Sequence, residues 1–203
     1  MLEITRLTVE HLAQGCVTDC PAPRIGFAVQ SDRNDAELTD AILQVGDWNV
    51  HLPQDGQTGT AYKGPALLPF TTYGVRLAVT DNTGAAAEAE TTFETGRMET
   101  PWRGQWISDP AFTFTEAKVS PVPMVFRKTI ETAKPIARAR LYATAMGIYE
   151  VELNGQKLGQ QYFAPGFTSY KSYLQYQTYD VTELLTGHDT VSYTHLTLPT
   201  NSL

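Results

Sequence analysis

Apolar and polar residues alternate in short runs along this chain, and helical periodicity is nearly absent. Glycine, asparagine, aspartate and proline separate the runs, as they do in the turns between short strands. Runs of this kind in the first half are RIGFAVQ (24–30), YGVRLAVTD (73–81) and EAETTFETG (88–96). The pattern predicts an all-β fold built as an antiparallel sandwich.

The alternation breaks at residues 97–104, RMETPWRG, and then resumes. The later runs that are each typical of a strand are MVFRKTIE (124–131), ARARLYATA (137–145) and SYLQYQTYDV (172–181). We therefore expect two consecutive antiparallel β-sandwiches, the first in residues 1–98 and the second in residues 101–190.

The segment YEVELNGQKLG (149–159) carries the clearest local signal in the chain. Its apolar residues alternate with Glu150 and Glu152 up to the pair Asn154-Gly155. Asn-Gly is the preferred pair for a two-residue type I′ turn, because both positions need a positive φ. The segment predicts a β-hairpin with Asn154 and Gly155 at its tip.

The charge of the chain excludes several classes of partner. A formal net charge of −7 and a sequence pI near 5.0 argue against nucleic acid and against anionic membrane surfaces. No apolar stretch approaches the roughly 20 residues that span a bilayer. The start, MLEITRLTVEHLAQG, is neither basic nor followed by an apolar segment, so it does not resemble a secretory signal. We expect no nucleic-acid or membrane partner, and a cytoplasmic location.

Metal and cofactor sites are not indicated by the residue types that usually build them. Cys16 and Cys20 are the only cysteines, and a structural zinc ion takes about four ligands. The four histidines are scattered and offer no matching pair. We expect free thiols, no metal and no cofactor.

Several stretches of the second half resemble a known family. They are PWRGQWISDP (101–110), LYATAMGIYEVELNG (141–155), APGFTSY (164–170) and LQYQTYDVT (174–182). In order and spacing they are similar to the N-terminal accessory domain of bacterial α-L-rhamnosidases, and the likeness covers about residues 101–190. Where the family often has tryptophan after APG, this chain has Phe167. The resemblance implies a jelly-roll or galactose-binding-like sandwich.

Residues 1–98 resemble the fibronectin-type-III-like, immunoglobulin-like domain that precedes it in the same enzymes. The stretches that carry this likeness are APRIGFAVQSD (22–32) and FETG (93–96). The tryptophan that often follows a strand tyrosine is missing, because Tyr73 is followed by Gly74 and Val75.

The last residues depart from the family pattern. In the family the second domain continues into another strand and then into a large (α/α)₆ barrel, whereas this chain reads VSYTHLTLPTNSL from Val191. That string is similar to translated sequencing-adaptor read-through. We expect a chain cut at about Thr190, before the barrel, with residues 191–203 as a non-native tail. The alternative is a natural, divergent last strand, because valine, tyrosine and threonine favour β structure.

No catalytic residue can be carried over from the resemblance. An inverting glycosidase needs two carboxyl groups about 6.5–9.5 Å apart, and in the family both lie in the barrel. The acids of the second half, Asp109, Glu116, Glu150, Glu152 and Asp180, stand in no matching motif. We expect them on solvated strand faces and at turns.

The aromatic residues between positions 162 and 176 are the candidate contact residues: Tyr162, Phe167, Tyr170, Tyr173 and Tyr176. Three interpretations are open for them. They could pack against the absent catalytic barrel, fill the core, or stack on the rings of rhamnosylated glycosides.

Three functions are compatible with the sequence as a whole. The first is a non-catalytic N-terminal part of an α-L-rhamnosidase, an inverting hydrolase that releases terminal α-L-rhamnose, in which the two domains brace the barrel and help to recognise substrate. The second is a free-standing carbohydrate-binding module or the sugar-binding domain of another glycosidase. The third is an adhesion or scaffold protein. Fold class alone does not separate them.

Overall fold

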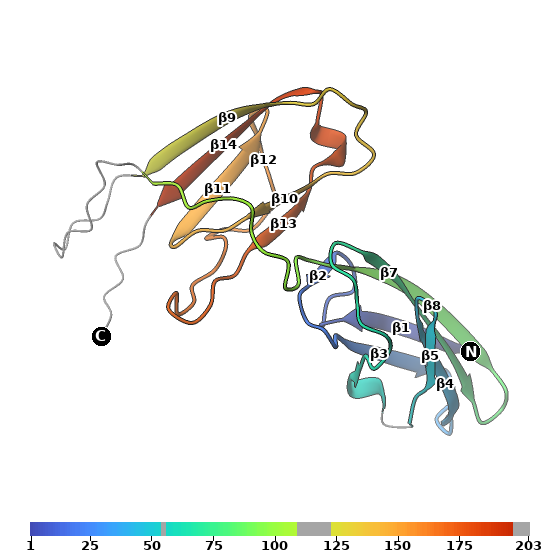
Figure 1. Cartoon of the computed structure of the whole chain (residues 1–203). Coiled ribbons are helices and arrows are strands. Elements are labelled where there is room, and N and C mark those ends of the chain that lie inside the picture. Colours follow the sequence, from blue (N-terminus) through green and yellow to red (C-terminus); the bar gives the residue numbers. More distant parts are fainter. Residues whose placement is uncertain (54–55, 109–122, 197–203) are drawn as a thin grey trace. The chain divides into compact units, whose positions relative to one another are not determined.

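The computed structural model describes residues 1–53, 56–108 and 123–196 (Figure 1). The chain forms two compact units, Met1–Gly104 and Gln105–Leu203. All the regular structure of the described residues is β, apart from two short 3₁₀ turns, η1 (Gly56–Thr58) and η2 (Thr182–Leu184). The predicted all-β class is confirmed.

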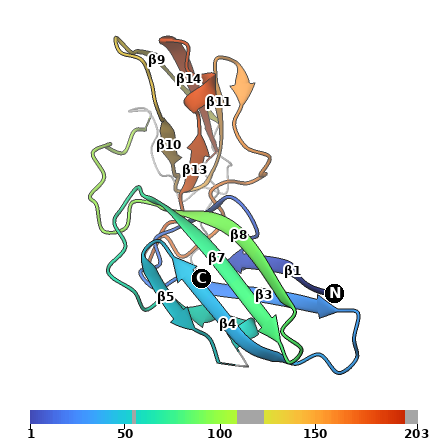
Figure 2. The same cartoon turned by 90° about the vertical axis from the view of Figure 1, so that its right-hand side faces the viewer.

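Unit 1 is a sandwich of two sheets. The strands are β1 (Leu2–Val9), β2 (Cys16–Thr18), β3 (Arg24–Ser31), β4 (Leu38–Val45), β5 (Trp48–His51), β6 (Thr60–Ala61), β7 (Thr72–Asp81) and β8 (Ala86–Thr95). One sheet has the order β1-β3-β6, and the other has the order β2-β8-β7-β4-β5. Figure 2 shows β4, β7 and β8 side by side in the larger sheet.

The alternation in the sequence explains which residues form the core of unit 1. In β4 and β7 every second residue is buried, and the register brings the buried residues of the two strands opposite one another on one face. The paired core positions are Ala41–Val79, Leu43–Leu77 and Val45–Val75. Phe93 of β8 adds a ring that stacks on Tyr73, with centroids 5.4 Å apart.

One strand pair of unit 1 differs from the predicted antiparallel arrangement. Strand β2 runs parallel to the end of β8, with Cys16 opposite Phe93. The chain leaves β1 in one sheet and enters β2 in the other sheet, and Glu10, His11 and Gly15 take positive φ between them. The other strand pairs of unit 1 are antiparallel, so the predicted sandwich holds with this one exception.

Unit 2 has a four-stranded sheet and a two-stranded sheet. Its strands are β9 (Met124–Glu131), β10 (Arg140–Ala143), β11 (Ile148–Leu153), β12 (Gln156–Lys157), β13 (Gln177–Asp180) and β14 (His188–Leu196). The sheet orders are β12-β11-β14-β9 and β10-β13. The buried residues Tyr149, Val151 and Leu153 of β11 face Ala143 and Val181 in the core of this unit.

The hairpin predicted at residues 149–159 is confirmed. Strands β11 and β12 pair with Leu153 opposite Gln156, which leaves Asn154 and Gly155 as a two-residue loop. Their φ values are 54° and 78°, as a type I′ turn requires.

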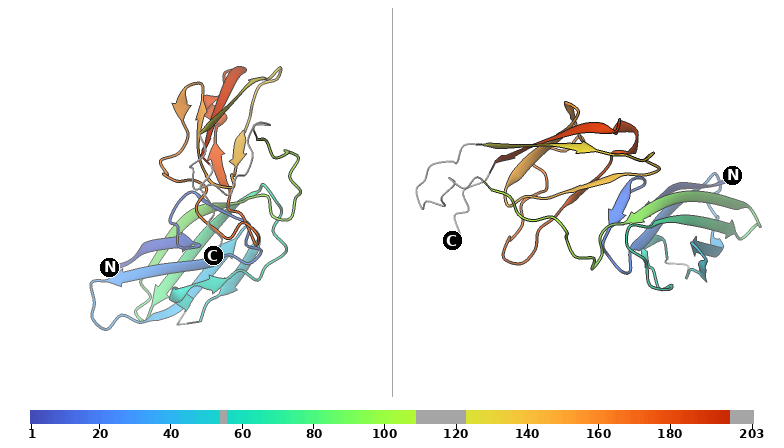
Figure 3. Two further views of the ribbon diagram at one scale, coloured as in Figure 1. Left: turned by 90° about the vertical axis from the view of Figure 1, so that its left-hand side faces the viewer. Right: turned by 45° about the horizontal axis from the view of Figure 1, so that its top comes forward.

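Strand β14 does not stop at Thr190, the predicted end of the second domain. It runs to Leu196 between β11 and β9, with Leu153 opposite Val191 and Met124 opposite His195. In Figure 3 the red β14 lies beside the yellow β9. The boundary at residue 190 is therefore corrected to at least Leu196, because the β-favouring residues after Val191 complete the backbone pairing of two neighbours. The predicted non-native origin of residues 191–203 stays a prediction, and residues 197–203 lie outside the described part.

A buried carboxylate fastens the start of β14 to the hairpin. Asp189 is fully buried, and its Oδ1 accepts hydrogen bonds from Asn154 Nδ2 (2.9 Å) and from the backbone N–H (2.8 Å) and hydroxyl (2.7 Å) of Thr186. The N–H of Gly187 donates to Oδ2 (3.0 Å). These hydrogen bonds, that of Asn154 foremost, lower the pKa of Asp189 to about 2, although burial acts in the opposite direction.

Candidate functional site

The five predicted contact residues lie on one connection of unit 2, which joins β12 to β13. We call residues 161–176 the aromatic loop. Its first part runs beside β11, where the Tyr149 N–H donates to the Ala164 carbonyl oxygen (2.8 Å). Farther along, Gln177 Nε2 donates to the Pro165 carbonyl oxygen (3.1 Å). Thr144 Oγ1 donates to the Gln175 carbonyl oxygen (2.6 Å), so the loop is fastened at both ends.

Residues 168–173 form a compact turn, which takes up the first two residues of the strand predicted at residues 172–181. The N–H groups of Ser172 (2.8 Å) and Tyr173 (3.0 Å) both donate to the Ser169 carbonyl oxygen. The Thr168 hydroxyl donates to the Tyr173 carbonyl oxygen (2.8 Å). Local hydrogen bonds of this kind compete with a strand ladder, so only Gln177–Asp180 pairs as β13. The expectation of one long strand here is wrong.

Three of the predicted residues project into solvent. The exposed fractions are 78% for Tyr162, 76% for Phe167 and 60% for Tyr173. The ring of Phe167 lies 5.9 Å from that of Tyr170, at an interplanar angle of 58°. Exposed rings at this density are typical of a contact surface.

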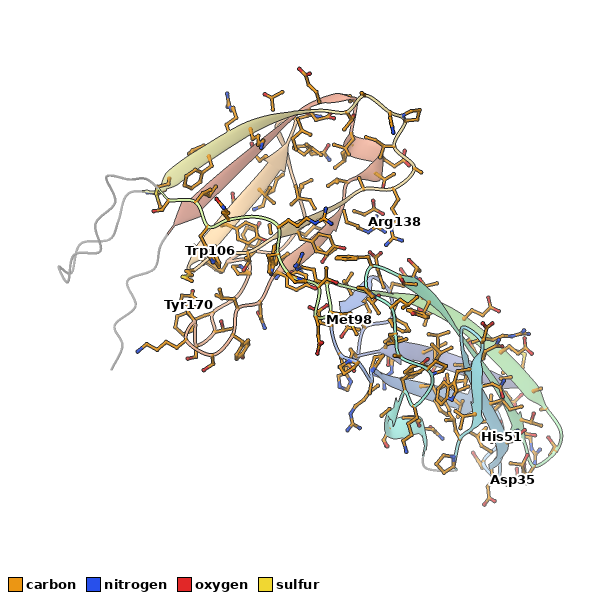
Figure 4. The ribbon with its side chains drawn as sticks, viewed as in Figure 1. Asp35, His51, Met98, Trp106, Arg138 and Tyr170 are labelled. Atoms are coloured by element: carbon orange, nitrogen blue, oxygen red, sulfur yellow. The ribbon has the colours of Figure 1, made fainter. Side chains whose placement is uncertain are left out.

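The other two predicted residues are partly buried. The ring of Tyr176 lies 5.9 Å from that of Tyr142 in β10, so it packs on its own unit. Tyr170 is labelled in Figure 4, and its hydroxyl oxygen is buried without a hydrogen bond of normal geometry to the described residues. Burial raises the pKa of Tyr170, and a weaker interaction with the backbone of Gly147 acts in the opposite direction.

The sequence interpretation missed Phe163. Its exposed fraction is 72%, as large as that of the neighbouring Tyr162. Strand alternation would turn adjacent residues to opposite faces, but Phe163 takes a φ of 58°, which lies outside strand geometry. The only signal for it is the adjacency of two aromatic residues before Ala164-Pro165.

A charged pair lies beside one exposed ring. Lys157 Nζ lies 4.9 Å from the centroid of the Tyr162 ring and 2.5 Å from Glu150 Oε1. Its hydrogen bond to Glu150 is the main cause of the raised pKa of Lys157. The pair places a cation on one side of Tyr162 and leaves most of the ring in solvent.

Two of the described acids of unit 2 named above are held in ion pairs. Glu150 is paired with Lys157, and Asp180 is paired with Arg140 (2.7 Å). Asp180 also accepts a hydrogen bond from the Thr182 hydroxyl (2.7 Å), which is the first cause of its lowered pKa. Glu152 is exposed, while Asp109 and Glu116 lie outside the described residues. Within the described ranges, no group of three or more His, Cys, Asp or Glu residues could hold a metal ion.

A hollow of another kind lies in unit 1. It is an open groove of about 860 Å³ beside β1 and β8, and its polar lining includes Arg6, Gln44, Arg76 and Glu90. No aromatic side chain lines it, so it lacks the stacking surface on which pyranose rings bind. We therefore place the candidate site at the aromatic loop and not at this groove.

No helix of the described residues is long and apolar enough to cross a membrane.

Two family models match the chain. One, described as a Rha78A-like N-terminal immunoglobulin domain, matches residues 4–99, and the other, the alpha-L-rhamnosidase N-terminal domain, matches residues 134–194. The chain carries the two N-terminal β domains of α-L-rhamnosidases. The second match ends at Thr194, so it includes part of β14 beyond residue 190.

Individual α-L-rhamnosidases agree with these matches over short spans. One from Streptomyces avermitilis is 59% identical over 49 residues, which is 24% of this chain and 5% of that protein. One from Formosa agariphila is 33% identical over 105 residues, which is 49% of this chain and 11% of that protein. The solved α-L-rhamnosidase from Dictyoglumus thermophilum has the same fold over 94% of this chain and 24% of its own, with a TM-score of 0.82 at 23% identity. The chain thus spans a small part of each relative.

Proposed function

We propose that this chain is a non-catalytic N-terminal part of an α-L-rhamnosidase and that the aromatic loop docks onto the catalytic domain of that enzyme. The observation that carries the proposal is the solvent exposure of Tyr162, Phe163, Phe167 and Tyr173 on one loop. Large rings in water are costly, and burying them against another domain returns about 25 cal/mol for each Å² covered. The catalytic domain implied by the resemblance, an (α/α)₆ barrel, is the partner to which we assign this surface.

The polar groups of the loop support docking over sugar binding. A sugar site sets free hydroxyl, amide or carboxylate groups beside its aromatic platform. Here the Thr168 hydroxyl of the loop and the adjacent Gln177 amide, at the start of β13, hydrogen-bond to the backbone of the loop. They are therefore already committed to holding the loop in shape.

A carbohydrate-binding role is the second candidate, and one observation favours it. Tyr162 stands beside the ion pair of Lys157 and Glu150, so an open ring and two charged groups lie together. In that case the chain would bind a rhamnosylated glycoside directly, as a carbohydrate-binding module or as the sugar-binding domain of a glycosidase.

A chimeric enzyme separates the two candidates. The N-terminal domains of the Formosa agariphila relative are replaced by this chain, and the triple substitution Tyr162→Ser, Phe167→Ser, Tyr173→Ser is compared with the unsubstituted chimera. Docking predicts faster thermal inactivation of rhamnosidase activity with an unchanged KM. The matched control is Leu68→Ser, which removes an equally exposed apolar side chain from unit 1.

Two results would count against docking. One is an inactivation rate of the triple variant equal to that of the Leu68→Ser control. The other is saturable binding of L-rhamnose by the isolated chain at millimolar sugar that the triple substitution abolishes, which would favour the carbohydrate-binding role.

A further inference from the structure

At the tip of the β11–β12 hairpin, Asn154 of the pair Asn154-Gly155 is hydrogen-bonded to the buried Asp189. Asn154 Nδ2 donates to Asp189 Oδ1 (2.9 Å) and to the Leu184 carbonyl oxygen (3.2 Å). Gly155 follows with a φ of 78°, and the place where a Cβ would stand has no heavy atom within 4 Å. Gly155 therefore adds no side chain beside its own backbone nitrogen, and the place of its missing Cβ is open.

An asparagine followed by glycine can lose its amide without a catalyst. The Gly155 backbone nitrogen attacks Asn154 Cγ, so an N–Cγ bond forms, the Cγ–Nδ2 bond breaks, and ammonia leaves with the proton of the attacking N–H. Water then opens the resulting succinimide ring at one of its two carbonyl groups, which gives aspartate or isoaspartate. No oxidant or reductant is needed.

The folded hairpin opposes the first step. Ring closure requires Cγ of Asn154 to swing onto the Gly155 nitrogen, which breaks the hydrogen bonds from Nδ2 to Leu184 and Asp189. The acceptor carboxylate is held by Thr186 and Gly187 in a fully buried position, so it cannot follow the moving amide. Asn154 can therefore react when β14 and the hairpin separate.

We propose that Asn154 is a deamidation site that its hydrogen bond to Asp189 protects, and that deamidation takes place during the openings of β14. We call this hydrogen bond the clasp. In the aspartate product a carboxylate replaces the carboxamide, whose Nδ2 lies 2.9 Å from Asp189 Oδ1 in the closed form. In the isoaspartate product the main chain runs through the former side chain, which adds one carbon atom to the backbone of the two-residue turn. Two carboxylates at that distance repel each other, and Asp189 is fully buried. A modified hairpin therefore does not close again on β14, and the opening becomes irreversible.

The first test follows the mass of tryptic peptides from the full chain, incubated at neutral pH with and without urea. We expect modification at Asn154 to be at least about tenfold slower in the native chain, because a reaction that needs opening is scaled by the open population. Asn82 is the internal control, since the β-branched Thr83 after it hinders the same attack in both conditions. Equal rates at Asn154 in native buffer and in urea would overturn the protection.

The second test changes the clasp. Asp189→Asn is expected to raise the native rate at Asn154 severalfold and to leave the rate in urea unchanged; an unchanged native rate would overturn the role of Asp189. The wild-type comparison stands whether or not this variant folds. Asn154→Asp is expected to melt below Asn154→Gly, which also loses the amide but adds no charge. Equal melting of these two variants would overturn the irreversible step.

Discussion

At the scale of single residues, Asp189 ties three segments of unit 2 to one carboxylate. Its pKa of about 2 lies below the ordinary value of 3.8, so the unfolded chain binds more protons between these two pH values. The stability that Asp189 contributes is therefore complete above about pH 3.8 and is lost as the pH falls toward 2.

Thermal unfolding at a series of pH values checks this account of Asp189. We expect Asp189→Asn to lower the Tm of unit 2 at neutral pH, and the gap to the wild type to shrink between pH 3.8 and 2. Asp180→Asn is the control, because Asp180 is largely exposed and its loss should cost much less at neutral pH. A gap that stays constant across this pH range would contradict the assigned pKa shift.

Gly159 is a second residue whose identity is dictated by its surroundings. It has a φ of 72°, and a Cβ there would stand 2.8 Å from the Tyr179 ring, whose hydroxyl lies 3.2 Å from that of Tyr149. Gly159→Ala should destabilise unit 2 by about 1–3 kcal/mol in urea unfolding. Gly74→Ala, where φ is not left-handed and no atom lies within 4 Å, should change stability by less than about 0.5 kcal/mol. If the two substitutions had equal effects, neither the positive φ of Gly159 nor the nearby Tyr179 ring would constrain this position.

At the scale of elements, strand β11 supplies three of the eight buried core residues of unit 2, more than any other strand there. Leu153 is buried, and its neighbour Glu152 is exposed on the other face. Leu153→Ala should cost about 2–5 kcal/mol of unfolding free energy, and Glu152→Ala less than about 0.5 kcal/mol. Denaturant unfolding of both variants measures the difference, and similar costs would mean that β11 does not pack as described.

Strand β9 is the outer strand of the four-stranded sheet, and none of its residues belongs to the buried core cluster. Val125 is 67% exposed on it. An exposed apolar side chain on an outer strand favours pairing with another chain, and a lysine in its place discourages it. Val125→Lys should reduce self-association in sedimentation velocity at high concentration and leave the Tm unchanged. Unaltered association would place the contact on another surface.

The elements also show what the sequence can and cannot predict. The hairpin at Asn154-Gly155 was predictable, because two adjacent positive φ values admit few residue pairs. The loop at residues 168–173 was not, because alternation cannot report that Thr168 and Ser169 would take up its backbone hydrogen bonds. Alternation likewise does not predict the positive φ of Phe163, so its exposure could not be predicted either. The parallel β2–β8 pair depends on a change of sheet that no local pattern encodes.

At the scale of the whole molecule, the charge is divided unequally between the units. The sequence of unit 1 holds fourteen acidic and seven basic residues, whereas that of unit 2 holds eight of each. The net charge of −7 thus belongs to unit 1, and the aromatic loop lies in the electrically balanced unit. A neutral surface with exposed rings suits lasting contact with another domain better than steering of a charged ligand.

The claim on which the function depends is that these two β domains hold no glycosidase chemistry of their own. The most direct test is hydrolysis of a chromogenic α-L-rhamnoside by the purified chain, followed at neutral pH against buffer alone. We predict no turnover above the buffer rate, since Glu150 and Asp180 are held in ion pairs with Lys157 and Arg140. Turnover that rises with the concentration of the chain and survives repurification would contradict the assignment of the chemistry to another domain.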